Sequence, residues 1–122
     1  MSEIKIDYRN FAFDNLLECN YPLRFIGVCT KQGKLLESVY RKDLVPLFSD
    51  TELHFSILKT ALRASIRDND QKLGKVLYTV TTYEYVKRAT IPLDDELLLV
   101  CSFEKNADEN SVIKNILESI KQ

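Results

Sequence analysis

The chain has little glycine, proline or cysteine and no tryptophan; three residues of each of the first three types occur among its 122 residues. So few glycines and prolines argue against long disordered linkers, which are commonly rich in them. The cysteines Cys19, Cys29 and Cys101 are odd in number and widely spaced, which argues against a disulfide framework or a CxxC metal site. We therefore expect reduced, partly buried thiols.

The sequence also lacks an excess of charge of either sign. Lys and Arg number 17 against 18 Asp and Glu, a net charge of −1. A general nucleic-acid binder needs a basic face, so this balance argues against that class while leaving room for a local basic patch. The longest apolar run, Leu97–Cys101, is too short to cross a bilayer. Neither a signal peptide nor a lipidation motif is visible, so we expect a cytoplasmic protein without a membrane partner.

What is present is typical of a globular protein. Hydrophobic residues make up 45% of the chain and charged residues 29%. A chain of this length buries enough of its surface to hold a core without metals or disulfides. We expect one domain over residues 1–122.

Apolar spacing and capping residues predict three helices. The first spans 7–20 with Asp7 as N-cap, and the last spans roughly 110–121 behind Asp108 or Asn110. The longest covers about 51–69, capped by Asp50 or Thr51. Its main apolar stripe at helical spacing consists of Phe55, Leu58, Leu62 and Ile66. Further apolar residues on the adjoining flank are Leu53, Ile57 and Ala64.

Runs of β-prone residues predict five strands, at 23–30, 35–41, 76–85, 88–93 and 96–103. The Gly-containing turn at 31–34 joins the first two as a hairpin. Gly27 lies in mid-strand, which indicates either a bulge or a place of close packing. The strand at 96–103 is almost continuously apolar, as a central strand covered on both faces should be.

The elements follow the order α-β-β-α-β-β-β-α. This order predicts an α+β fold with a five-stranded antiparallel sheet, whose two faces must both be covered. We expect the two terminal helices on one face and the long middle helix on the other.

This order, and the hairpin sequence RFIGVCTKQGKLLES, resemble the roadblock and longin-like group of profilin-like folds, which are three-layer sandwiches. A narrower pattern is similar to a family of single-domain archaeal proteins. It consists of RFIGVCTKQGKLL, LRASIR, DQKLGKVLYTV and ATIPLDDELLLVCS. The element order that carries the roadblock resemblance spans nearly the whole chain. The motifs of the narrower pattern are structural ones.

The roadblock resemblance implies a homodimer in which the middle helices and third strands meet, here Leu53–Arg67 and Val76–Tyr85. The residues point to the same places, because the middle helix is apolar over more than one face. A long β-prone edge strand without internal Pro or Gly is also a template for association. The expected interface residues are Leu53, Ile57, Ala64, Val76, Tyr78, Val80 and Tyr83. A small GTPase as partner follows by analogy alone, since no GTPase-contact motif is recognisable.

Lys59, Arg63 and Arg67 are spaced four residues apart and therefore form one basic column on the middle helix. Such a column can receive an acidic partner, a phosphate or a carboxylate, or it can simply be a solvated helix face. If Lys72, Lys87 and Arg88 lie nearby, the column becomes part of a wider patch.

Signatures of catalysis or of bound cofactors are missing. His54, the only histidine, has no partner at the spacing of a metal site. The pair Asp68 and Asp70 begins like a calcium loop but lacks its glycine and distal glutamate. We expect turn acids there and at Asp94, Asp95 and Glu96. No phosphate-binding glycine motif or nucleophile elbow occurs, so we expect no enzyme, no cofactor and no metal.

The sequence therefore predicts a non-catalytic, homodimeric protein-interaction or scaffold module with an unidentified protein partner. The alternative is a small-molecule sensor of the PAS or profilin-like type, with a pocket between sheet and helices. The residues expected to line that pocket are Tyr78, Tyr83, Tyr85 and Phe103. Cys29 and Cys101 are expected on adjacent strands, either as a redox pair or as two core thiols.

Overall fold

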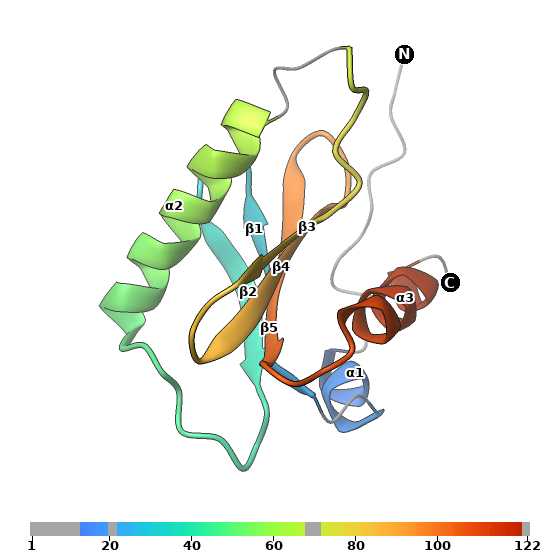
Figure 1. Ribbon diagram of the computed structural model, residues 1–122. Helices are drawn as coiled ribbons and strands as arrows, with labels where there is room; N and C mark the ends of the chain where they lie inside the picture. The colour runs from blue at the N-terminus through green and yellow to red at the C-terminus, as the bar shows by residue number, and fades with distance from the viewer. Residues whose placement is uncertain (1–12, 20–21, 68–71, 121–122) are drawn as a thin grey trace.

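The computed structural model describes residues 13–19, 22–67 and 72–120. Within them the chain forms three helices and five strands in the expected order (Figure 1). The helices are α1 (Phe13–Cys19), α2 (Asp50–Arg67) and α3 (Glu109–Ile120). The strands are β1 (Leu23–Thr30), β2 (Leu35–Tyr40), β3 (Thr79–Thr82), β4 (Val86–Pro92) and β5 (Leu97–Glu104). The expected start of the first helix, including Asp7, lies outside the described residues.

The five strands form one antiparallel sheet in the order β2-β1-β5-β4-β3. β5 lies at its centre and β1 is interior, as their apolar sequences predict. Gly27 sits in β1 where a Cβ would lie 3.0 Å from the ring of Phe25 and 3.1 Å from the Glu37 carbonyl oxygen. Close packing therefore explains this glycine, and the register shift of the hairpin falls at Val28 and Cys29 instead.

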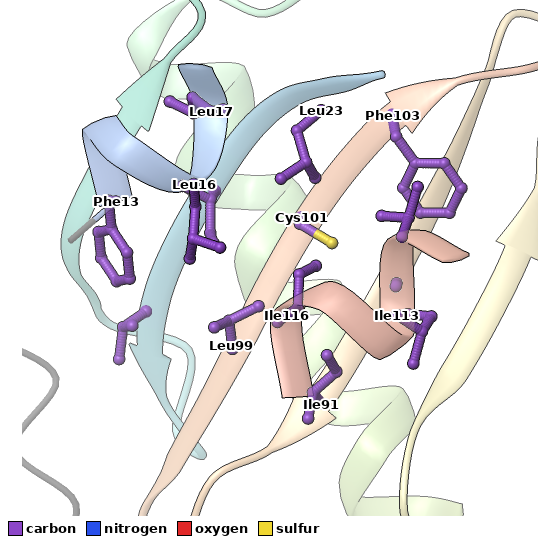
Figure 2. Packing of buried hydrophobic residues seen from close by; sticks show 14 residues of the cluster. Phe13, Leu16, Leu17, Leu23, Ile91, Leu99, Cys101, Phe103, Ile113 and Ile116 are labelled. Carbon is purple, nitrogen blue, oxygen red and sulfur yellow. The ribbon is translucent and has the colours of Figure 1, made fainter. Parts of the chain in front are cut away.

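The sheet separates two apolar cores. α2 covers one face and α1 with α3 covers the other, which confirms the expected layers (Figure 1). Figure 2 shows the larger core, where Leu16 from α1 and Ile116 from α3 meet Leu99 and Cys101 of β5. The smaller core lies under α2. Its buried members are Phe25, Cys29, Leu53, Ile57, Ala61, Leu98 and Val100.

Cys29 and Cys101 lie on the neighbouring strands β1 and β5 but belong to opposite cores. Cys29 faces α2, whereas Cys101 faces α1 and α3. Both are free and fully buried. Two thiols on opposite faces of a sheet cannot bond without rearrangement of the strands, so they are core thiols and not a redox pair.

The structure corrects the expected orientation of α2. The stripe expected as its main apolar face, Phe55, Leu58, Leu62 and Ile66, is exposed. Leu53, Ile57 and Ala61 are buried against the sheet instead. The helix also begins one residue earlier than expected, at Asp50. Ser49 is its N-cap: its Oγ accepts from the Glu52 N–H, and the Glu52 carboxylate accepts from the Ser49 N–H at 3.0 Å.

The third strand is also shorter than expected. β3 comprises four residues, Thr79–Thr82, where a strand over 76–85 was predicted. The Tyr83 N–H donates to the Val86 carbonyl oxygen at 2.9 Å, so the chain already turns into β4 at that point. β3 pairs with β4 on one side and is an edge of the sheet on the other.

Candidate functional site

A pocket of about 620 Å³ lies between α2, the 41–49 connection and the β3–β4 turn, over the face of the sheet that α2 covers. The sheet supplies Arg24, Phe25, Tyr40, Val86, Arg88 and Ser102. The connection supplies Leu44, Leu47 and Phe48, and the turn supplies Tyr83 and Tyr85. α2 contributes Glu52, Leu53, Phe55, Ser56, Lys59 and Arg63. Aromatic rings and cations therefore share one concave surface.

Arg88 occupies the floor of this pocket. Its position on β4 is opposite Thr81 of β3 and Ser102 of β5, and its Nη1 donates a hydrogen bond to Ser56 Oγ on α2. Burial lowers the pKa of the Arg88 guanidinium; the nearby Tyr83 raises it and the charge of Arg63 lowers it. Within the residues that the structure describes, no carboxylate forms an ion pair with Arg88.

The expected basic column divides between two places. Lys59 and Arg63 line the pocket, where Arg88 joins them. Arg67 lies further along α2, beside a much smaller depression formed with Ala64 and Val76. Lys87 points to the other face, where its Nζ contacts Glu109 of α3 at 3.5 Å. Arg88 therefore joins the column and Lys87 does not, while Lys72 is exposed and does not line the pocket.

The other charges of the pocket are partly neutralised. Arg24 Nη1 forms an ion pair with Glu104 at 2.5 Å, and Arg41 Nη2 lies 3.8 Å from the same carboxylate. Glu52, the acidic residue of the pocket lining, is engaged in the cap of α2. Its hydrogen bonds with Ser49 lower the pKa of this carboxyl. The unpaired charge that remains in the pocket is therefore positive.

One end of the pocket is aromatic. The rings of Phe25 and Tyr40 are tilted against each other with centroids 4.9 Å apart. Burial raises the pKa of Tyr40, the Asp50 carboxylate raises it too, and Arg88 lowers it.

A second surface is the outer face of α2. Its four apolar residues Phe55, Leu58, Leu62 and Ile66 are 61%, 50%, 63% and 65% exposed. They follow one another at intervals of three, four and four residues and so form one stripe. Contiguous exposed apolar surface is typical of interaction sites, so this stripe is a second candidate site.

The expected interface residues are distributed unevenly. Leu53 and Ile57 are buried under α2, so naming them as interface residues was wrong: the sheet of the same chain already covers them. Ala64 is half-buried on the same side. Val76 and Val80 are half-buried, while Tyr78 and Tyr83 are exposed near the β3 edge. For these four, a role in an interface stays a prediction.

The remaining candidates are placed as follows. His54 is exposed on α2. The Asp94 carboxylate accepts the backbone N–H groups of Glu96 and Leu97, both at 2.8 Å, and so shapes the β4–β5 turn. Asp68 and Asp70 lie outside the described residues. Over the described part of the chain, no group of His, Cys, Asp and Glu side chains has the arrangement of a metal site.

Of the four residues expected to line a ligand pocket, Tyr83 and Tyr85 do so. Phe103 is fully buried in the core on the opposite face, and Tyr78 lies outside the pocket. Arg88 was not predicted as a pocket residue. Its signal was an arginine inside a strand whose neighbours Ala89 and Ile91 are apolar.

Solved structures with the same fold are roadblock/LC7 domains. MglB from Thermus thermophilus superposes with a TM-score of 0.73 at 16% identity, covering 88% of this chain and 78% of that one. A Streptomyces avermitilis roadblock/LC7 domain gives 0.72 at 9% identity, covering 88% and 87%. An MglB described as having a tetrameric arrangement gives 0.74 at 16%, covering 88% and 78%. The chain therefore has the roadblock/LC7 fold.

No family model and no curated protein matches the sequence. The narrower resemblance to archaeal proteins accordingly stays a prediction. Among the described residues, no helix has the length and apolar character needed to span a membrane.

Proposed function

We propose that this chain is a non-catalytic protein-interaction module that self-associates through the outer face of α2. The observation that carries the proposal is the exposed stripe Phe55, Leu58, Leu62 and Ile66. The opposite face of the same helix already holds it to the sheet. Leu58 also borders the turn at Gly33 of the same chain, yet all four side chains of the stripe keep at least half of their surface exposed. Exposing four large apolar side chains in one row is costly unless another molecule covers them.

A second copy of the chain fits this stripe because its spacing is nearly symmetric. If two α2 helices pack antiparallel about a two-fold axis near Thr60, Phe55 lies opposite Ile66 of the partner subunit. Leu58 then lies opposite the partner's Leu62. The acidic first turn of one helix, Asp50 and Glu52, also approaches the basic last turn of the other. Such an isologous contact is the commonest interface of homodimers.

The open edge of β3 is a second place for association. Because Tyr83 donates to Val86 across the turn, the alternation of an antiparallel pair directs the backbone groups of Val80 and Thr82 outward. Two such edges can pair across a two-fold axis. Support also comes from the tetrameric arrangement of a structure with the same fold. A further protein partner, such as a small GTPase, rests on the fold resemblance alone.

Sedimentation velocity at micromolar concentration tests the proposal. The native chain should sediment as a dimer, and Leu62→Glu should shift it to a monomer because a buried, unpaired carboxylate opposes the contact. Val45→Glu is the matched control, since Val45 is 85% exposed and lies outside the stripe. Thr82→Pro removes an outward N–H and reports separately on the strand edge.

The proposal fails if the native chain is a monomer, or if Leu62→Glu sediments as the native chain does. If Thr82→Pro alone dissociates the dimer, the contact belongs to the β3 edge and not to α2. Circular dichroism of each variant confirms that the fold is retained.

A further inference from the structure

The pocket floor contains a cation without a counter-charge among the described residues. Arg88 is half-buried, and its hydrogen bond goes to the neutral Ser56 hydroxyl. No carboxylate in the described part of the chain pairs with it. A guanidinium has five donors, and a buried charge without a partner is unfavourable. Arg88 therefore lacks the anionic partner that a structural ion pair would give it.

Two more cations converge on the same space. Lys59 and Arg63 line the pocket, and neither forms an ion pair with the residues that the structure describes. Arg63 and Arg88 carry like charges on one pocket, and the charge of Arg63 lowers the pKa of Arg88. An anion between Arg63 and Arg88 would offset the repulsion of the two positive charges and accept hydrogen bonds from both guanidinium groups. Since the whole chain carries a net charge of −1, the concentration of positive charge is local.

The rest of the pocket suits an apolar body. Its volume of about 620 Å³ holds a small organic molecule but not a folded segment. Phe25, Tyr40, Phe48 and Tyr85 contribute rings to the lining, and Leu44 and Leu47 contribute aliphatic surface. Leu47 and Phe48 line the pocket and are still partly exposed, so an apolar body could cover them.

We propose that this pocket binds a small amphipathic organic anion. Its carboxylate or phosphate head lies between Arg88 and Arg63, with Lys59 at the rim. Its acyl or aromatic body packs against Phe25, Tyr40 and the 41–49 connection. This activity is separable from self-association, because the residues that bind the head belong to one chain and are outside the apolar stripe. Of that stripe, Phe55 is the residue that the pocket lining shares.

The first test separates a ligand-binding role of Arg88 from a structural one. If Arg88 serves the fold, Arg88→Met should lower the melting temperature. If it serves a ligand, Arg88→Met should leave the melting temperature of the unliganded chain unchanged or raised, because an apolar side chain of similar length replaces an unpaired buried charge. A clear loss of stability in the unliganded chain would count against the proposal.

The second test is calorimetric titration with matched anionic and neutral probes, octanoate against octanamide and phenyl phosphate against phenol. At least one anion should bind with at least about tenfold higher affinity than its neutral partner, because hydrogen bonds between charged groups are stronger than those to neutral groups. The better anion of the two identifies the head group. Arg88→Met and Arg63→Gln should each weaken that anion about tenfold while leaving the neutral probe unchanged.

The matched control is Arg67→Gln, which removes the same charge from the same helix column but outside the pocket. It should leave binding within about twofold of the native value, because the exposed Arg67 side chain is not part of the pocket lining and cannot donate hydrogen bonds to the head group. Equal weakening by Arg67→Gln and Arg63→Gln would reduce the effect to general electrostatics and overturn the proposal. So would failure of both anions to bind more tightly than their neutral partners.

Titration of Leu62→Glu keeps this proposal distinct from self-association. A monomeric Leu62→Glu chain that still binds the anion shows that one chain holds the complete pocket. Loss of binding in that variant would mean that the second copy completes or fills the site, and would overturn the proposal as stated. A native chain that binds the anion as a monomer would instead remove only the proposed dimer.

Discussion

At the scale of single residues, the buried thiol of Cys101 makes stability depend on pH. Burial raises the pKa of this thiol from 9.0 to about 12, although a hydrogen bond with the Ala89 backbone and the charge of Arg88 oppose the shift. Between these two values the unfolded chain releases the proton while the folded chain keeps it. The unfolded chain then binds fewer protons, so the free energy of unfolding decreases as pH rises.

We therefore expect Cys101 to contribute a decrease of about 1.4 kcal/mol per pH unit above pH 9, measured by urea unfolding at a series of pH values. Cys101→Ala is less stable at every pH because of the cavity, but its slope should be smaller by this amount. Other groups titrate in the same range in both proteins, so the difference between the slopes is the quantity that matters. Identical slopes would contradict the expectation.

At the scale of elements, the β1–β2 hairpin turn fits closely against α2. Gly33 has a φ of +92°, and a Cβ there would lie 2.7 Å from Leu58 Cδ1 and 2.9 Å from Leu58 Cα. Gly74 has a similar φ of +84°, but a Cβ there would meet no atom within 4 Å. Both positions therefore favour glycine for backbone reasons, and Gly33 additionally allows the turn to approach the helix.

This pair permits a matched prediction. Gly74→Ala should cost about 1–2 kcal/mol for the left-handed backbone alone. Gly33→Ala should cost that amount plus about 1–3 kcal/mol, because the new methyl group collides with the helix backbone. Chemical denaturation measures both values. Equal losses would mean that the turn and α2 do not touch in solution.

The same scale shows why the sequence predicted the α2 helix but not its buried face. Apolar residues occupy both sides of it, so periodicity supports either orientation. The buried side contains the small residues Thr60, Ala61 and Ala64, which let the helix backbone approach the sheet. Fit to the sheet decides the orientation, and it depends on the facing residues of β1 and β5 as well as on those of the helix.

The strand elements show a similar limit. β1 matched its predicted bounds because its apolar run ends at a Gly-containing turn. β3 is shorter because Val, Thr and Tyr favour extended backbone wherever they occur, and their run at 76–85 includes the turn between β3 and β4. The pocket was harder still to predict from the sequence, because Arg63 and Arg88 are distant in sequence. They come together only through the pairing of β4 with β5 and the placement of α2.

At the scale of the whole molecule, self-association and stability should be linked. A contact that exists only in the folded state stabilises it by mass action, so the melting temperature of a dimer rises with protein concentration. Leu62→Glu should remove this dependence, because its folded state is monomeric at every concentration used. Arg88→Met should keep it, because Arg88 lies in the pocket and not in the stripe.

Differential scanning calorimetry over a hundredfold range of concentration, about 2 µM to 200 µM, separates these outcomes. For the native chain we expect the melting temperature to rise by several degrees. Each tenfold change in concentration changes the free energy of the dimer by about 1.4 kcal/mol. In a domain of this size, 1 kcal/mol shifts the melting temperature by about 3–6 °C. Val45→Glu should rise as the native chain does. A melting temperature independent of concentration in the native chain would mean that the folded molecule is complete as a monomer, and would contradict self-association through the exposed stripe of α2.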